Sequence, residues 1–286
     1  MRVMLPVLAG LLALPATATA GPPPHRLDRA AAGFWTAARI RQALGSDSMT
    51  HRDVPATATG AGLSSLRVFE ASALEDRTNG RVFGVDPREG PYSCSGTSLR
   101  TPSESIVLTA GHCVLDNGSW GRDVVFVPAF DHEERPFGIF RATRAFVTPW
   151  WRRTGNSDFD VAALRVEPNF LGSLGVVVGA KGWTSGRSRH AKLQIFGYPA
   201  AALEGEELRS CAGRGLGSDK LTNGLPGPPT LPARCDMAGG SSGGAWLVDG
   251  GTLIDGVTSY GYTANHNRLY SPYFGPAVAH FLSQLP

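Results

Sequence analysis

The sequence has no run of lysines and arginines and little net charge. Its 286 residues carry a formal charge of +3 at pH 7, and most of the arginines stand alone. Proteins that bind nucleic acid concentrate basic residues on one face or in one segment, where they neutralise phosphates. The composition therefore argues against nucleic acid as a partner.

The sequence also lacks a long apolar segment after its first twenty residues. Those twenty have the order of a secretory signal: Arg2 is positively charged, Met4–Leu14 is apolar, and Ala18–Ala20 offers small side chains for cleavage. The apolar part is shorter than the roughly 20 residues that a membrane helix needs. We therefore expect residues 1–20 to be a signal peptide and the rest to be secreted, extracellular and free of the membrane.

A third absence is the Cys-x-x-Cys pair that is typical of zinc sites. The four cysteines are an even number, which suits disulfides in an exported protein. The cluster Asp131–Glu134 has one histidine and no second histidine four residues away, so we expect an exposed charged turn rather than a metal site. Two disulfides are expected, with three pairings open among Cys94, Cys113, Cys211 and Cys235.

Neither an internal repeat nor a regular alternation of strands and helices is present, which argues against an α/β fold. From Arg81 onward, short β-type runs are separated by Gly, Pro, Asn and Asp, a pattern typical of all-β proteins. The chain closes after Pro276 with apolar residues at helical spacing, Val278, Phe281, Leu282 and Leu285. The expected strands are Arg81–Val85, Ser93–Leu99, Ser105–Thr109, Val124–Pro128, Gly138–Val147, Val161–Val166, Lys192–Tyr198, Gly244–Val248 and Thr252–Ser259.

Residues 21–80 differ in composition from the rest of the chain. They open with three prolines and are rich in small and polar residues. We expect a pro-peptide or flexible leader there, with a short amphipathic helix within Ala30–Leu44, and a single domain over residues 81–286. The alternative is a structured extension that packs on the domain.

Three short motifs carry candidate chemistry. In Leu108–Cys113, His112 follows a β-type run and precedes a cysteine, so it is a candidate for a rigidly held base. Asp160 stands directly before an apolar run, where a carboxylate can be buried and paired with a histidine N–H; Asp158 is the nearby alternative. Alone, each motif is explained as well by a structural histidine or a polar turn.

In the third motif, Gly239–Trp246, Ser242 lies among glycines and an apolar run comes directly after them. A nucleophilic hydroxyl needs nearby backbone N–H groups that converge on an oxyanion, and glycines permit the dihedral angles this requires. A flexible Gly/Ser linker is the competing interpretation. The apolar run favours a tight turn that enters a strand.

Together, the motifs "TAGHC", "D-V-A-x-L" and "G-S-S-G-G" resemble the chymotrypsin-like serine peptidases, which share their chain order His, Asp, Ser. The resemblance spans about Arg81 to Phe274. It is nearest to trypsin-like peptidases secreted by actinobacteria and more remote from glutamyl endopeptidases. It implies two six-stranded antiparallel β-barrels with a C-terminal helix, and a monomer that cleaves polypeptide substrates without a metal or an organic cofactor.

The resemblance also implies a role for each matching residue. Ser242 would attack the scissile carbonyl and form an acyl-enzyme, His112 would transfer the proton, and Asp160 would orient the histidine. The backbone N–H groups of Gly240 and Ser242 would form the oxyanion hole. Ser259, Tyr260 and Gly261 would pair with the substrate backbone, and the disulfides would be Cys94–Cys113 and Cys211–Cys235.

Some positions depart from the trypsin pattern. Ser241 stands where trypsin-like zymogens have an aspartate that pairs with the new N-terminus, which makes that activation route doubtful even if Arg81–Val82 is a processing site. Asp236 is placed by counting at the floor of the specificity pocket, or else is a solvated loop acid. Thr258 stands where glutamyl endopeptidases carry a histidine.

Two other classes of protein compete with the peptidase interpretation. The motif Gly240–Gly244 also fits the G-x-S-x-G elbow of esterases, but an α/β-hydrolase needs several further β-α units after the serine, and the tail is too short. A non-catalytic, protease-like binding protein is the main alternative. The three filled triad positions argue against it, and an exported structural protein has only the proline-rich leader in its favour.

Overall fold

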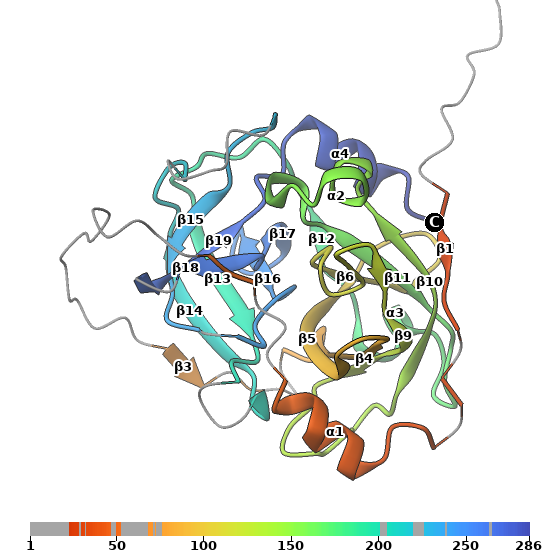
Figure 1. Ribbon diagram of the computed structural model, residues 1–286. Coiled ribbons are helices and arrows are strands. Elements are labelled where there is room, and N and C mark those ends of the chain that lie inside the picture. The colour runs from red at the N-terminus through yellow and green to blue at the C-terminus, as the bar shows by residue number, and fades with distance from the viewer. Residues whose placement is uncertain are drawn as a thin grey trace, which may run out of the picture.

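The computed structural model describes most of the chain after the expected signal peptide (Figure 1). Residues 1–20 and most of residues 53–75 lie outside the described part. The described residues are 23–28, 30–31, 33–46, 50–52, 68–70, 72, 76–200, 205–219, 226–237, 239–262 and 265–286.

Most of the regular structure is β-strand, and the helices are few and short. The strands expected from the sequence are present within one to three residues of their predicted ends. In chain order the elements are β1 His25–Arg26, α1 Ala37–Leu44, β2 Thr50–Arg52, β3 Val68–Glu70, β4 Asn79–Asp86, β5 Gly90–Leu99, β6 Ile106–Thr109, β7 Leu115–Asp116, β8 Ser119–Trp120, β9 Arg122–Pro128, β10 Phe140–Val147, α2 Pro149–Thr154, the 3-10 helix η2 Ser157–Phe159, β11 Ala162–Val166, α3 Leu174–Val178, β12 Gly182–Trp183, β13 Lys192–Gly197, β14 Arg209–Arg214, β15 Leu231–Arg234, β16 Ala245–Val248, β17 Leu253–Val257, β18 Tyr260–Tyr262, β19 Asn265–Ser271 and α4 Pro276–Ser283.

The first half of the domain is a closed six-stranded antiparallel barrel, in the order β10-β11-β6-β5-β4-β9. It closes because β9 pairs with both β4 and β10. Side chains of β9 alternate between two cores: Val124 and Phe126 fill the barrel, whereas Val125 and Val127 face the larger core outside it. An apolar strand buried on both faces explains why this segment is nearly continuous in hydrophobic residues.

The second half consists of two sheets rather than one closed ladder among the described residues. One sheet has the order β12-β17-β16-β13-β14-β3 and the other β15-β19-β18-β2. Strand β3 pairs with β14 over Arg209–Cys211, and just after β14 an isolated bridge joins Gly215 to Ala233 of β15. The predicted second six-stranded barrel is therefore not confirmed among the described residues.

The described parts of residues 21–80 pack on the rest of the chain. Strand β1 pairs with β10, β2 with β18 and β3 with β14, while α1 lies against β4 and β5. Helix α1 is shorter than the predicted Ala30–Leu44 because Thr36 caps it, accepting a hydrogen bond from the Arg39 N–H. Its buried face carries Ile40, Ala43 and Leu44.

Helix α4 is confirmed as predicted, with Pro276 in its first turn. Val278, Phe281, Leu282 and Leu285 are all buried in the larger core. Within the described part of the chain, no helix is long and apolar enough to cross a membrane.

Candidate active site

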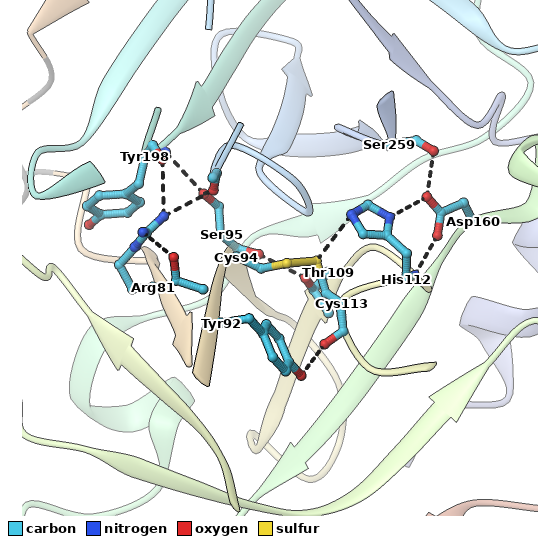
Figure 2. The surroundings of a disulfide bond; sticks show 12 residues. Arg81, Tyr92, Cys94, Ser95, Thr109, His112, Cys113, Asp160, Tyr198 and Ser259 are labelled. Carbon is cyan, nitrogen blue, oxygen red and sulfur yellow. Dashed lines mark hydrogen bonds and ion pairs between the residues drawn. A yellow bond between two sulfur atoms is a disulfide. The ribbon is translucent and has the colours of Figure 1, made fainter. Parts of the chain in front are cut away.

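His112 lies just after β6 and is held from three directions. Its backbone N–H donates to Asp160 Oδ1 at 2.8 Å, and its neighbour Cys113 is joined to Cys94 of β5 by a disulfide. The Tyr92 hydroxyl donates to the Cys113 carbonyl at 2.6 Å. The backbone around His112 is thus held by residues of the closed barrel (Figure 2).

Asp160 follows η2 and precedes β11, so the end of a buried strand aims its carboxylate. Its Oδ2 lies 2.8 Å from His112 Nδ1 and accepts a hydrogen bond from the Ser259 hydroxyl at 2.5 Å. Asp158 is buried as well. Both hydrogen bonds from His112 nevertheless end on Asp160, the residue preferred from the sequence.

Ser242 lies in the tight turn that precedes β16. Gly243 has a φ of +78°, and a Cβ at that position would lie 2.1 Å from Thr109 Oγ1 and 2.4 Å from the Ser95 carbonyl oxygen. Only glycine permits this close approach. The Ser95 N–H donates to the Ser242 carbonyl at 2.7 Å, so the turn is held against the strands that lead to His112.

The Ser242 side chain is fully buried, and its Oγ has no hydrogen-bond partner among the described residues. His112 Nε2 lies 3.8 Å from Cys113 Sγ, and the described contacts include no hydrogen bond between Nε2 and the Ser242 hydroxyl. In proteins without a bound substrate, such catalytic hydrogen bonds are often long and tighten only in the complex.

The N–H groups of Gly240 and Ser242 donate to no acceptor within the described part of the chain. Gly240 has a φ of +85°, in the left-handed region that glycine favours. Two N–H groups two residues apart, beside a serine hydroxyl, are the donors that an oxyanion hole requires.

Strand β18 continues from Ser259, the residue that hydrogen-bonds to Asp160. The hydroxyls of Tyr260 and Tyr262 each donate to Asp219 Oδ2 at 2.6 Å. Burial, together with the hydrogen bond to Asp219, raises the pKa of both tyrosines, which therefore stay protonated. These bonds fix the side chains of the strand that follows Ser259.

A cavity of about 480 Å³ opens beside the pair Asp160 and Ser259. The turn at Asp116, the helix α2 and Tyr260 form its walls. Trp151 of α2 also contacts the His112 ring edge-on, with ring centroids 6.4 Å apart. This cavity is large enough to accept amino-acid side chains next to the candidate triad.

The two residues considered for substrate preference lie differently from the triad. Asp236 is exposed, and it does not line the 480 Å³ cavity. Thr258 is fully buried, and its hydroxyl accepts a hydrogen bond from Trp246 Nε1 at 3.0 Å. The exposure of Asp236 fits a solvated loop acid better than a pocket floor.

The disulfides are Cys94–Cys113 and Cys211–Cys235. Because their sulfurs are bonded, the cluster of Cys94, Cys113 and His112 offers no thiolate to a metal. In the turn Asp131–Glu134, the half-exposed His132 is paired with Asp131 and Glu207.

Three residues at the site were not identified from the sequence as site residues. Arg81, considered as a processing site, is fully buried within β4 and paired with β5 and β9, so a protease cannot reach the Arg81–Val82 bond in the folded chain. Ser95 and Asp219 were not singled out. The sequence offered one signal for these residues, which is that Arg81 lies within a β-type run and so could be a buried arginine.

Comparisons with known proteins place the chain in a family. A family profile described as Trypsin matches residues 80–282. The protease Anisep from Arthrobacter nicotinovorans is 30% identical, covers 74% of this chain and 95% of its own, and superposes with a TM-score of 0.68. A thermostable serine protease, AL20, from an extremophilic microorganism is 32% identical over 74% of this chain and 98% of its own, with a TM-score of 0.67.

A curated relative matches over a shorter length. The glutamyl endopeptidase of Bacillus licheniformis is 30% identical over 120 residues, which are 40% of this chain and 35% of that protein. The chain therefore spans about a third of this relative's length. The trypsin profile, in contrast, includes His112, Asp160 and Ser242 and covers well over half of the chain. The chain belongs to the trypsin family.

Proposed function

We propose that this protein is a secreted serine endopeptidase that uses Ser242, His112 and Asp160. The observation that carries the proposal is the pair of hydrogen bonds from His112 to Asp160, 2.8 Å each, beside a glycine-rich turn with two available N–H groups. A buried carboxylate that holds one ring nitrogen leaves the other nitrogen as the base.

In the proposed reaction, His112 Nε2 removes the proton of the Ser242 hydroxyl as the oxygen attacks the peptide carbonyl. The N–H groups of Gly240 and Ser242 hold the tetrahedral oxyanion. Each of them stabilises the transition state by about 3 kcal/mol. His112 then protonates the leaving amine, and water hydrolyses the acyl-enzyme by the same steps in reverse order. Asp160 stabilises the imidazolium throughout.

Hydrolysis of an unstructured protein substrate tests this proposal. We expect the purified protein to cleave casein, and His112→Ala to reduce kcat by about 10⁴-fold or more. The matched control is His190→Ala, an exposed histidine whose Nδ1 lies 3.3 Å from the Gly215 carbonyl oxygen. A wild-type protein that binds peptides without cleaving them would support the non-catalytic alternative instead.

We further propose that residues 21–80 are a leader that covers the substrate-binding strand. Strand β2 pairs with β18 in parallel register, with Thr50 opposite Tyr260 and Arg52 opposite Tyr262. In a substrate, the residues before the scissile bond would lie along β18. Their chain must run toward Ser259 to bring the scissile carbonyl to Ser242, so the substrate strand must be antiparallel to β18. The leader therefore occupies this edge in the direction that presents no scissile bond.

The buried Ser242 is consistent with such a covered site. In this proposal, removal of the leader exposes β18 and also frees the part of β14 that β3 occupies, which allows the second half to close into a barrel. The peptidase domain in this proposal is residues 81–286, and because the start of β4 is buried, the cut that releases β2 and β3 lies before β4.

A proline in β2 tests the role of the leader. His51→Pro removes a backbone N–H and disfavours the strand, so the uncut chain should hydrolyse substrate roughly five- to thirtyfold faster, the factor that corresponds to 1–2 kcal/mol of lost pairing. Ala58→Pro, in the segment outside the described residues, is the control. An unchanged rate for His51→Pro, or an equal rise for both variants, would contradict this role.

A further inference from the structure

The turn that carries Ser242 must be held by contacts with neighbouring residues. Ser241 is neutral, so it cannot hold the turn through an ion pair with a new N-terminus. In this turn, two peptide planes bear the candidate oxyanion donors, and a third plane lies between them. Because the N–H of a trans peptide points away from the carbonyl of the same plane, a held carbonyl also fixes the direction of its N–H.

The two outer planes are held by backbone groups. The Gly239 carbonyl accepts a hydrogen bond from the Ala200 N–H at 2.5 Å, which fixes the N–H of Gly240. The Ser241 carbonyl accepts from the Gly244 N–H at 2.9 Å, which fixes the N–H of Ser242. The plane between them begins at Gly240, whose left-handed φ of +85° and missing side chain leave it few steric restraints.

Two side chains from the neighbouring strands β4 and β5 hold this central plane. The Gly240 carbonyl accepts one hydrogen bond from Arg81 Nη1 at 3.1 Å and another from the Ser95 hydroxyl at 2.9 Å. Arg81 and Ser95 are direct partners in the β4–β5 register. Figure 2 shows both side chains on one side of the Cys94–Cys113 disulfide, with His112 and Asp160 on the other.

Arg81 is built into this position. It is fully buried, and the same Nη1 also donates to the Tyr198 carbonyl at 3.1 Å while Nη2 donates to the Ser93 hydroxyl at 2.5 Å. A buried guanidinium is costly unless its N–H groups find acceptors, so these bonds orient it firmly. The Ser95 hydroxyl is oriented as well, because it accepts a hydrogen bond from the Tyr198 N–H at 3.0 Å.

We propose that Arg81 and Ser95 are positioning residues that hold the Gly240 carbonyl and thereby keep both oxyanion donors aimed at the reacting carbonyl. This inference rests on the proposed peptidase function. In trypsin-like zymogens, an acidic residue at the position of Ser241 pairs with the new N-terminus and supports this turn. In the present proposal, the buried Arg81 of β4 supports the turn instead. The oxyanion hole is therefore formed before any cleavage of the leader.

Substitutions that remove one donor at a time test the inference. Ser95→Ala removes the hydroxyl donor, and Arg81→Lys keeps the charge but loses the guanidinium fork. Each should lower kcat roughly 10- to 100-fold with KM changed less than about twofold, because the lost interaction acts only when the oxyanion forms. The affinity for a peptidyl boronate, which mimics that oxyanion, should fall by the same factor as kcat/KM.

Thr97→Val is the matched control, since it removes a buried β5 hydroxyl that donates to Asn79 Oδ1 at 2.7 Å and not to Arg81 or the turn. It should lower the thermal midpoint about as much as Ser95→Ala does and leave kcat within about twofold of wild type. The pH profile of kcat should keep its midpoint in all three variants, because His112 and Asp160 are untouched.

The outcomes separate this inference from the proposed function. If the wild-type protein hydrolyses substrate in a Ser242-dependent manner but folded Ser95→Ala and Arg81→Lys variants keep their kcat and boronate affinity, the positioning role is wrong and the peptidase function stands. If Thr97→Val loses as much kcat as Ser95→Ala, the effect is structural and the inference is also wrong. If the wild-type protein shows no Ser242-dependent hydrolysis, the proposed function itself is wrong.

Discussion

Asp160 is 1% exposed and yet accepts three hydrogen bonds, from the His112 backbone, the His112 ring and the Ser259 hydroxyl. A carboxylate can be buried at little cost only when such donors replace its water. Because two of the three donors belong to His112, the carboxylate fixes both the backbone and the ring of that residue. The placement of the base therefore depends on Asp160 more than on any other single side chain.

Asp160→Asn should keep the fold but lower kcat about 10⁴-fold at neutral pH. An amide can donate where the carboxylate only accepts, so it favours the tautomer of His112 that carries no lone pair toward Ser242. Peptide hydrolysis and circular dichroism measure the two effects. The control is Asp158→Asn, since the His112 bonds end on Asp160; an equal loss in that variant would contradict the assignment.

The candidate triad could be predicted from the sequence because each member lies in a short motif with a recognisable neighbourhood. Arg81 and Ser95 could not, because their contact with Gly240 joins residues 159 and 145 positions apart. No local pattern marks such a pair. Asp219 is similar, since its partner Tyr260 lies 41 positions away.

At the scale of elements, the two disulfides have different tasks. Cys94–Cys113 ties β5 to the segment of His112, whereas Cys211–Cys235 ties β14 to the end of β15. The chain segments that they close are similar, with sequence separations of 19 and 24. Similar loops should give similar stabilisation, about 3 kcal/mol each in the chain-entropy account.

Replacing each pair by alanines should therefore lower the free energy of unfolding by about 3 kcal/mol in both cases. Only the loss of Cys94–Cys113 should also lower kcat, by roughly tenfold, because the position of His112 then varies. Urea unfolding and steady-state kinetics below the unfolding transition measure the two quantities. Equal kinetic losses in both variants would argue against a special role for the first disulfide.

Strands could be predicted where apolar side chains are continuous or alternate, as in β9 and β11. The strands β14, β15 and β19 were not predicted, since segments such as Asn265–Ser271 are rich in polar residues. Strand β18 was expected only from the family resemblance, and it pairs with β19. The pairing of leader strands with both sheets of the second half could not be read from composition either. Their partners lie about 140–210 positions away, so long-range register decides them.

At the scale of the whole molecule, a buried acid in the second half links stability to pH. Asp255 of β17 is 3% exposed, and its Oδ1 has no hydrogen-bond partner among the residues that the structure describes. Burial raises the pKa of Asp255 to about 7; Arg187 opposes and Asp249 reinforces this shift. The folded state therefore binds this proton more tightly than the unfolded chain, whose carboxyl has an ordinary pKa of about 4.

Because the protonated Asp255 is favoured in the folded state, it contributes to the free energy of unfolding. This contribution is fully present below pH 4 and is lost as the pH rises through about 7. Asp255→Asn mimics the protonated acid, so it should be more stable than wild type at pH 8 by roughly 1–2 kcal/mol and nearly equal to it at pH 4. Urea titrations at both pH values measure this. Glu89→Gln, at an exposed acid in the turn between β4 and β5, is the control; a stability difference between Asp255→Asn and wild type that does not change with pH would contradict the assignment.

The closed barrel and the two sheets meet at the Ser242 turn, where strands of the first half hold a segment of the second. Both His112 and Asp160 come from the first half, and Ser242 comes from the second. The central claim is that this junction activates one particular serine. Its neighbour Ser241 is chemically identical and equally buried, which provides an internal comparison.

The most direct test is labelling of the purified protein with a fluorophosphonate, followed by mass spectrometry of its peptides, before and after cleavage of the leader. We expect a single adduct on Ser242 that forms faster after cleavage, is absent in Ser242→Ala and is retained in Ser241→Ala. An adduct on Ser241, or no adduct on the cleaved wild-type protein, would contradict it.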